Sequence, residues 1–447
     1  MAYTFRGGIH VNEYKNTAGK AVEALPDVKS VSIPLSQHIG APAVPVVAVG
    51  DEVKIGQKIA DVPEDKLGCP IHASISGKVT GIVKKTIPSG AVVEHIVIEN
   101  DGMNEYDESV MPPEKPYTQM TADEIISVIR NAGIAGMGGA SFPTYAKIRS
   151  AVGKVDTIII NCAECEPFIT ANHRLLVEEP DTIIGGVKIL LHCLGVKETY
   201  IAIEDNKPDA IKIMKEKLAG NDDISVRVMK TKYPQGDERQ LIYALKKVEI
   251  PTGNLPADVG CVLFNAETCA SVYRAFAVGV PSVRRIVTVD GDCVNEPKNL
   301  LVPIGASVTD IIDFCGGLKK QPTRLISGGP MMGIAQWDRE MPVTKATSAI
   351  LFFSEDFGKK KTKNANCIHC GKCIKNCPMH IMPMYIAQFS KAGDYTRAEE
   401  YGAMSCVECG SCSYNCPGGV EIVQYIRVAK AAIRTEKARL KALGQNK

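Results

Sequence analysis

Cys367-Ile-His-Cys-Gly-Lys-Cys-Ile-Lys-Asn-Cys-Pro378 is repeated in spacing by Cys406-Val-Glu-Cys-Gly-Ser-Cys-Ser-Tyr-Asn-Cys-Pro417. We call these stretches the first and the second motif. The spacing C-x2-C-x2-C-x3-C-P is typical of chains that hold 4Fe–4S clusters through cysteine thiolates. In proteins with two such clusters, the fourth cysteine of each motif ligates the other cluster. We therefore predict one cluster on the first set, Cys367, Cys370, Cys373 and Cys416, and another on the second set, Cys406, Cys409, Cys412 and Cys377.

Two other chemistries use closely spaced cysteines. A zinc ribbon needs four ligands in paired C-x-x-C knuckles, which leaves the third cysteine and the proline of each motif unexplained. A disulfide framework is disfavoured because no signal peptide opens the chain and thiols stay reduced in the cytosol. Iron–sulfur clusters are the preferred interpretation, with zinc as the alternative.

Length and composition set outer limits. A chain of 447 residues with 45% hydrophobic residues is expected to fold into about three or four domains. A net charge of +2 gives no indication of a nucleic-acid partner. No apolar run reaches the roughly 20 residues of a membrane span. We expect a soluble or peripheral protein whose membrane role, if it has one, comes through partner subunits.

The N-terminal part divides by its turn signals. Residues 1–30 carry no recognisable chemistry, and residues 31–100 alternate short β-forming runs with turns at Gly50-Asp51 and Gly56-Gln57. The pattern resembles a biotinyl/lipoyl-type barrel sandwich. Lys66 lies where lipoylated members carry the modified lysine, but the loop around it is a poor copy of their hairpin, so we expect an unmodified lysine. Residues 101–120 are a Pro-rich linker.

Residues 121–281 alternate helical and strand patterns. A capping box at Thr121 and Glu124 predicts a helix through Asn131. Strands are expected at 155–160, 199–203 and 224–229, and helices at 182–194, 208–218 and 237–247. This alternation predicts a Rossmann-like parallel sheet with ligand sites at the carboxyl ends of its strands.

The remaining segments complete a multidomain α/β chain. Residues 282–355 read as a small α+β module with a helix near 309–314, and 356–366 as a basic linker. The cluster-binding domain covers 367–425. Residues 426–447 continue a Lys- and Arg-rich helical pattern over 420–443, which predicts a solvated face.

A second chemical signal is the glycine-rich loop from Gly133 to Thr144. Its four glycines would let the backbone amides approach an anion, and Pro143 would begin a helix whose N-terminus favours phosphate. Lys147, one turn later, would add a cation. Such a loop alone fits a tight helix–helix connection equally well.

Three polar segments at strand ends strengthen the signal, because parallel strands bring their carboxyl ends to one edge of the sheet. Each combines amide, carboxylate or small residues directly after a predicted strand. Their candidate ligand-binding residues are Asn161, Glu164 and Glu166, then Tyr233, Gly236, Asp237 and Glu238, and finally Asn265 and Thr268.

The order of these blocks resembles the FMN- and NADH-binding subunit of respiratory complex I. With a barrel sandwich in front and two cysteine motifs behind, residues 5–425 resemble the C subunits of Rnf complexes, a family of ion-translocating ferredoxin:NAD oxidoreductases. The resemblance identifies residues 283–353 as similar to a soluble-ligand-binding β-grasp (SLBB) domain. It implies FMN, NAD(H) and two 4Fe–4S clusters as cofactors.

The resemblance also implies roles for single residues. The loop glycines would line the flavin with Lys147 nearby, while Asn161, Glu164, Asn265 and Thr268 would hold its ribityl and phosphate groups. Phe142 would stack on the nicotinamide nucleotide beside the remaining candidates. The glycines concerned are Gly136, Gly138 and Gly139. Met137 and Ala163 depart from the complex I pattern, which usually has Arg and Asp there.

The implied activity is electron transfer between NAD(H), FMN and the two clusters. The chain would lie peripherally on the cytoplasmic side of the cell membrane, exchange electrons with ferredoxin indirectly, and bind other Rnf subunits. No catalytic side chain is expected, because the cofactors carry the chemistry. The alternatives are a soluble flavin/iron–sulfur reductase, such as a cobalamin reductase, and a non-enzymatic ferredoxin-like electron carrier. Cys162 and Cys165 form a C-x-x-C that we attribute to chance and not to a redox dithiol.

Overall fold

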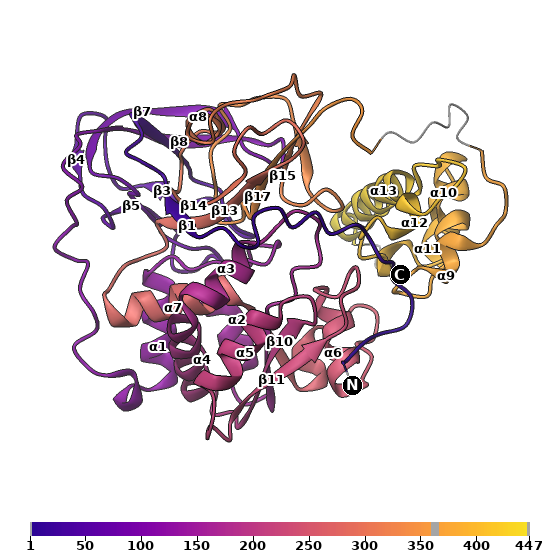
Figure 1. The fold of residues 1–447 in the computed structure, drawn as a ribbon, viewed down its shortest axis with the longest axis horizontal. Helices are drawn as coiled ribbons and strands as arrows, with labels where there is room; N and C mark the ends of the chain where they lie inside the picture. Colours follow the sequence, from indigo (N-terminus) through magenta and orange to yellow (C-terminus); the bar gives the residue numbers. More distant parts are fainter. Residues whose placement is uncertain (1, 359–365, 445–447) are drawn as a thin grey trace.

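The computed structural model describes residues 2–358 and 366–444 and shows three parts (Figure 1). A β-rich unit lies above an α/β unit, and the helical C-terminal domain lies beside both. Most of the predicted basic linker, residues 359–365, lies outside the described residues.

The α/β unit is built on a four-stranded parallel sheet in the order β11-β10-β9-β12. Ile158 and Ile160 of β9 pack into the core on one face, and Ile159 packs into the core on the other. This burial on both faces explains why the strand is a continuous apolar run, and it confirms the predicted Rossmann-like sheet. The strands are β9 Thr157–Asn161, β10 Glu198–Glu204, β11 Ile224–Met229 and β12 Cys261–Asn265.

Six helices pack against one core of this sheet and a seventh, α6, against the other. The helices are α1 Ala122–Asn131, α2 Thr144–Ala151, α3 Ala171–Glu178, α4 Pro180–Leu194, α5 Pro208–Lys217, α6 Glu238–Lys246 and α7 Ala266–Ala277. The capping box of α1 forms as predicted, with Thr121 and Glu124 bonded reciprocally. Helices α3 and α7 were not predicted. Helix α7 follows β12 without a loop because Asn265 ends the strand and caps the helix.

The β-rich unit combines the barrel sandwich with the α+β module. The barrel sandwich contains sheets β2-β8-β7-β4 and β3-β5-β6, and the module contains the sheet β1-β14-β13-β17-β15-β16. Val31 and Ile98 of the former share one core with Val287 and Phe352 of the latter. The two segments are separate patterns in the sequence but one packed body.

Most strands of this unit are short, and β7 and β8 are the longest. Its strands are β1 Val22–Ala24, β2 Ser30–Pro34, β3 Val44–Pro45, β4 Glu52–Val53, β5 Lys58–Asp61, β6 Ile71–His72, β7 Gly77–Thr86, β8 Val92–Asn100, β13 Arg284–Asp290, β14 Lys298–Pro303, β15 Arg324–Ser327, β16 Ile334–Gln336 and β17 Ala349–Phe353, with helix α8 Val308–Phe314. The N-terminal segment contributes β1, which pairs in parallel with β14. Short 3-10 turns lie at Tyr117–Gln119, Pro256–Val259 and Ala403–Ser405.

The C-terminal domain is helical. Its helices are α9 Lys372–Lys375, α10 Pro383–Lys391, α11 Tyr395–Glu400, α12 Ser411–Tyr414 and α13 Ile422–Ala442. Ile386 of α10 packs against Ile426 and Ile433 of α13, so this domain has its own core. The predicted solvated face of α13 is wrong for Lys430, which is buried and donates to the Cys406 carbonyl oxygen at 2.8 Å. None of the helices in the described ranges is long and apolar enough to cross a membrane.

Candidate nucleotide crevice and iron–sulfur sites

The predicted ligand-binding segments meet at the carboxyl edge of the parallel sheet. Asn161 ends β9 and lies opposite Asn265, which ends β12. The chain leaves β9 toward β10 on one side and returns as β12 on the other, so this edge is a topological switch point. A Cβ added to Gly138 would lie 3.4 Å from the Asn265 Cβ, so the glycine-rich loop closes over the same edge. We call this edge, with Asn161, Asn265 and the loop beside them, the nucleotide crevice.

The glycine-rich loop has some amides with protein acceptors and others without them. The Gly136 N–H donates to the Phe142 carbonyl oxygen at 2.8 Å, and the Met137 N–H donates to the Thr268 Oγ1 at 3.0 Å. Within the described residues, the amides from Gly138 to Ala140 donate no hydrogen bond and are exposed. These free donors suit an anion held by backbone amides.

Two buried hydroxyl groups reinforce this donor set. Ser141 Oγ and Thr144 Oγ1 are buried at the start of α2, and neither has a hydrogen-bond partner within the described residues. Buried hydroxyls are normally satisfied, so two orphaned ones beside a helix N-terminus are available to a bound anion. The loop therefore fits the phosphate end of a flavin nucleotide. Neither hydroxyl was among the predicted site residues, although both lie inside the glycine-rich loop from Gly133 to Thr144.

Two buried cations from the β-rich unit hold the loop from behind. The Arg285 guanidinium donates to the Met137 carbonyl oxygen at 2.8 Å, and the Lys345 ammonium donates to the Gly133 carbonyl oxygen at 2.6 Å. Burial lowers the pKa of Lys345 to about 8. The sequence suggested that Met137 removes a positive charge from the loop, but Arg285 places one at that residue's own carbonyl group. No local pattern marks either cation, because both are far from the loop in sequence.

The strand-end loops are also tied to one another. The Asn161 side-chain amide donates to the Gly236 carbonyl oxygen at 2.8 Å, and its oxygen accepts from the Ala163 N–H at 3.1 Å. Asp237 caps α6, and burial raises the pKa of its carboxyl group to about 6. Asn161 and Asp237 thus brace the crevice wall, while their predicted cofactor contacts remain predictions.

Lys147 lies beside the crevice with its ammonium 3.0 Å from the Leu263 carbonyl oxygen. Burial lowers the pKa of Lys147, and the negative charge of Glu238 opposes this shift. The structure therefore brings together a cation from α2 and a carboxylate from α6, both of them predicted site residues.

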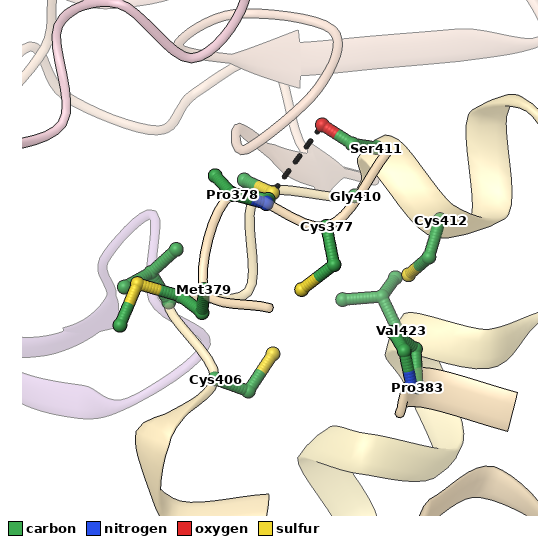
Figure 2. Close-up of a pocket in the computed structure, with 11 residues that line it drawn as sticks. Cys377, Pro378, Met379, Pro383, Cys406, Gly410, Ser411, Cys412 and Val423 are labelled. Atoms are coloured by element: carbon green, nitrogen blue, oxygen red, sulfur yellow. Dashed lines mark hydrogen bonds between the residues drawn. The ribbon is translucent and has the colours of Figure 1, made fainter. Parts of the chain in front are cut away.

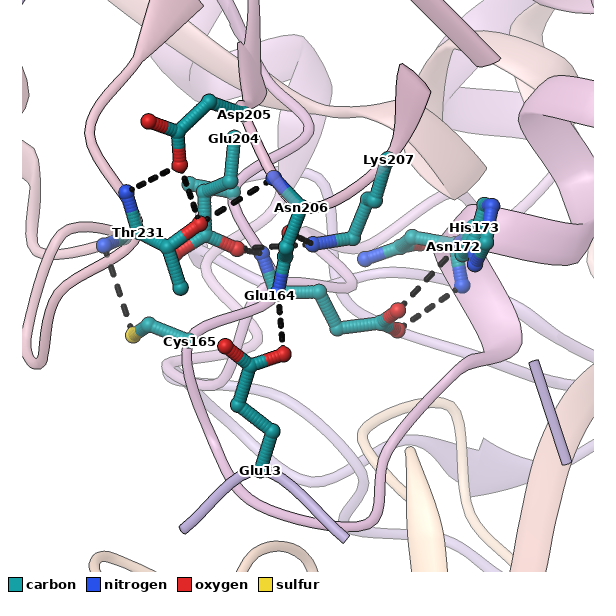
Figure 3. Close-up of polar contacts among 12 residues, drawn as sticks. Glu13, Glu164, Cys165, Asn172, His173, Glu204, Asp205, Asn206, Lys207 and Thr231 are labelled. Atoms are coloured by element: carbon teal, nitrogen blue, oxygen red, sulfur yellow. Dashed lines mark hydrogen bonds and ion pairs between the residues drawn. The ribbon is translucent and has the colours of Figure 1, made fainter. Parts of the chain in front are cut away.

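The two glutamates after β9 accept hydrogen bonds from protein amides. Figure 3 shows Glu164 directed at the start of α3, where its oxygens accept from the amides of Asn172 at 2.9 Å and His173 at 3.3 Å. Glu166 accepts from the amides of Met331 at 3.0 Å and Met332 at 2.9 Å. Their roles toward a cofactor remain predictions, since both carboxylates already have partners.

Lys15 stabilises the same loop from the N-terminal segment. Its ammonium donates to the carbonyl oxygens of Glu164 at 2.7 Å, Glu166 at 2.8 Å and Ile169 at 2.6 Å. Burial lowers its pKa. Sequence reasoning assigned no chemistry to residues 1–30, and only the fold brings Lys15 to this loop.

Cys162 and Cys165 show no feature of a reactive dithiol. Burial raises the pKa of both thiols, whereas redox-active cysteines have lowered pKa values. The Gly236 N–H lies 3.4 Å from the Cys165 sulfur, so this thiol packs between the two crevice loops.

The second predicted cysteine set lies around one cavity. Cys377 of the first motif and Cys406, Cys409 and Cys412 of the second line one shared pocket. In Figure 2 the sulfur atoms of Cys377, Cys406 and Cys412 point into this common space. Four thiol groups from two loops around a shared cavity fit a 4Fe–4S cluster. We call this the inner site.

The first predicted set is more exposed than the second. Cys370 is exposed, and Cys367, Cys373 and Cys416 are partly buried. The Cys367 sulfur lies 3.1 Å from the Met384 sulfur. We call this set the outer site.

Four family descriptions match parts of this chain. Residues 129–274 match the family described as the Nuo51 FMN-binding domain, and residues 3–103 match the RnfC barrel sandwich hybrid domain. Residues 286–335 match the SLBB domain, and residues 366–420 match the 4Fe-4S dicluster domain.

Two relatives are similar over nearly their whole length. One is the C subunit of the proton-translocating ferredoxin:NAD(+) oxidoreductase complex of Clostridium ljungdahlii, 44% identical over 99% of this chain and 96% of the relative. The other is the C subunit of the Na(+)-translocating complex of Acetobacterium woodii, 42% identical over 96% of this chain and 97% of the relative. An NAD+-reducing NiFe-hydrogenase is similar in fold, with a TM-score of 0.50 and 17% identity over 72% of this chain and 63% of that one.

The fold and the matches define a class of proteins that combine an FMN-binding domain with a 4Fe–4S dicluster domain. Within that class, the chain belongs to the family of C subunits of ion-translocating ferredoxin:NAD(+) oxidoreductase (Rnf) complexes. The predicted family, cofactors and fold class are thereby confirmed.

Proposed function

We propose that this chain is the peripheral NAD(H)- and FMN-binding electron-transfer subunit of a membrane-bound ion-translocating ferredoxin:NAD(+) oxidoreductase complex, on the cytoplasmic side. The observation that carries the proposal is that one chain combines a crevice suited to phosphate with a pocket lined by four cysteines. Family membership favours this function over a soluble reductase or a simple electron carrier.

The crevice residues would bind and orient the flavin. The amides from Gly138 to Ala140, with Ser141 and Thr144, would hold its phosphate, and Asn265 would lie against the same loop. Arg285 would keep those amides pointed into the crevice by holding the Met137 carbonyl group. When bound, FMN accepts two electrons from NADH as a hydride and releases them singly to iron–sulfur clusters.

The remaining predicted site residues would border the nicotinamide nucleotide or support the crevice. Phe142 would stack on the nucleotide, as the family resemblance implies, and Asp237 and Glu238 would line its pocket. The rest of the proposed cofactor-binding set is Gly136, Gly139, Lys147, Asn161, Glu164, Glu166, Gly236 and Thr268. Tyr233 is left out of this set because its hydroxyl donates to the Cys409 carbonyl oxygen.

Electrons would pass through the two cysteine sites in a fixed order. The inner site lies against the α/β unit, because the Tyr233 hydroxyl donates to the Cys409 carbonyl oxygen and the Gln240 side chain lies 3.5 Å from the Met379 sulfur. The outer site is exposed at Cys370. We therefore place the inner site next to the flavin and the outer site next to a partner subunit.

The test is anaerobic purification with FMN, iron and sulfide quantified, followed by NADH addition. We expect flavin bleaching and then cluster reduction, and absence of any spectral change would refute the function. Thr144→Val keeps the side-chain shape and removes one ligand-facing hydroxyl, so FMN binding should weaken about five- to tenfold.

Thr199→Val is the matched control for the Thr144 variant. Its hydroxyl is also buried and unpartnered within the described residues, but it lies near the opposite end of β10 from the crevice. FMN affinity should not change in this variant. Equal losses in both variants would show that the hydroxyl at α2 has no part in binding.

A further inference from the structure

Tyr233 does not point into the nucleotide crevice that its sequence motif predicts. Its side chain is 1% exposed, and its hydroxyl donates to the Cys409 carbonyl oxygen at 2.7 Å. Tyr233 and Cys409 belong to one small hydrophobic cluster with Ile9. The residue thus connects the α/β unit to a ligand loop of the inner site.

The backbone around Tyr233 extends this connection to the other ligand loop. Ile9 and Tyr233 exchange two backbone hydrogen bonds of 2.8 and 2.9 Å, and the neighbouring Gly8 N–H donates to the Asn376 carbonyl oxygen at 3.0 Å. Gly7 has a φ of +77°, and a Cβ there would lie 2.6 Å from the Cys377 carbonyl oxygen. Residues 7–9 therefore lie between Tyr233 and the loop of Cys377 and contact both.

The same short loop also reaches the crevice. Three residues after Tyr233, Gly236 accepts the hydrogen bond from Asn161 at the end of β9. A Cβ on Gly236 would lie 2.8 Å from the Ala163 carbonyl oxygen, so the two crevice loops touch through backbone. One short segment, residues 233–236, therefore contacts both the crevice wall and the inner site.

We propose that Tyr233 is a positioning residue for electron transfer, whose hydroxyl fixes the Cys409 loop at a set distance from the nucleotide crevice. The inference rests on the proposed function and adds a residue to it. A single electron crosses without bond formation, and the tyrosine keeps its proton. Because tunnelling rates fall steeply with distance, a hydrogen bond that sets this distance controls the rate of transfer.

The test compares Tyr233→Phe with wild type in the intact, cofactor-loaded protein. After anaerobic rapid mixing with NADH, flavin bleaching is followed optically and cluster reduction by freeze-quench EPR. We expect the cluster phase to slow severalfold relative to the flavin phase, because a longer gap between the two centres slows tunnelling. Amide hydrogen exchange over 406–412 should also become faster in the variant.

Tyr200→Phe is the matched control. It removes the hydroxyl of another buried tyrosine, on β10, and this hydroxyl donates to Glu198 and not to the cluster domain. Its ratio of cluster to flavin rates should equal that of wild type. If Tyr233→Phe loses iron on purification, Gly7→Ala tests the same junction from the Cys377 side and should slow the same phase.

The outcomes separate the two proposals. A wild-type protein that is not bleached by NADH refutes the proposed function itself. A bleached wild type with an unchanged rate ratio in Tyr233→Phe refutes the positioning role alone. If the variant instead weakens NAD(H) binding and the cluster phase merely follows the flavin phase, Tyr233 is a nucleotide contact and the inference is wrong.

Discussion

The two cysteine motifs have the same loop geometry and different surroundings. In each loop the second residue after the first cysteine has a positive φ, 53° at His369 and 57° at Glu408. The amide of that residue points at the first cysteine's sulfur, at 3.4 Å for Cys367 and 3.3 Å for Cys406. The spacing of the motif therefore dictates the ligand loop, as the N–H···S contacts in both copies show.

The surroundings differ because other parts of the chain pack against the inner site, at Cys409 of the second loop and at the Cys377 end of the first. Tyr233, Ile9 and Met331 cover the inner site, whereas Ile368 beside the outer site is 63% exposed. Burial and hydrogen bonding around the ligands tune a cluster's reduction potential and its access to partners. Tertiary packing, and not the motif, therefore assigns the inner and outer positions.

The largest effect should come from deleting one ligand of each site. Cys409→Ser should lose the inner cluster, so that NADH still bleaches the flavin but reduces no cluster. Cys370→Ser should lose only the outer cluster and retain an NADH-reducible inner one. Each variant should keep about half of the wild-type iron. EPR after NADH addition distinguishes the two sites, and failure of the inner cluster to be reduced in Cys370→Ser would reverse the assigned order.

Much of this comparison could be predicted from the sequence because it depends on local patterns. The isoleucines of β9 predicted a strand buried on both faces, and the parallel sheet brought Asn161 and Asn265 to one edge. The cysteine spacing predicted that Cys377 would join the second motif, and the inner cavity contains that set.

The rest depends on contacts between residues far apart in the chain. Arg285 and Lys345 reach the glycine-rich loop from the β-rich unit, and residues 7–15 return to the inner site and the crevice. No periodicity or spacing records such contacts. Tyr233 lies within a recognisable motif, but its side chain turns toward the cluster domain because the fold packs that domain against β11's following loop.

A medium effect, on stability, is expected from variants that test the position that His369 and Glu408 share in their motifs. Glu408 pairs with Lys430 and, at 3.1 Å, with Arg427, while His369 is exposed. Lys430→Met should destabilise the protein by about 2 kcal/mol, below the cost of breaking a fully buried pair because Glu408 is partly exposed. His369→Ala should change stability by less than about 0.5 kcal/mol.

Denaturant unfolding of the cofactor-loaded proteins measures both changes. Replacing Glu408 together with Lys430 by Gln and Met should recover part of the loss, because no carboxylate then lacks its partner. Equal effects of Lys430→Met and His369→Ala would contradict the difference in packing between the two motifs.

The smallest effect is expected in the pH dependence of stability, and it concerns Glu166 and the Met331 loop that covers the inner site. Glu166 holds the Met331 loop by two amide hydrogen bonds, and burial raises the pKa of its carboxyl group from 4.5 to about 7, with those bonds and Lys15 opposing the shift. The folded protein then binds this proton more tightly than the unfolded chain, so stability should fall as pH rises from about 4.5 through 7.

Glu166→Gln removes the titration, and the difference between variant and wild-type melting temperatures should change across that window and be flat above it. Asp237, with a pKa of about 6, contributes a slope of the same sign to both proteins and cancels in the difference. A difference that does not vary with pH would mean that Glu166 holds the loop as an ordinary carboxylate.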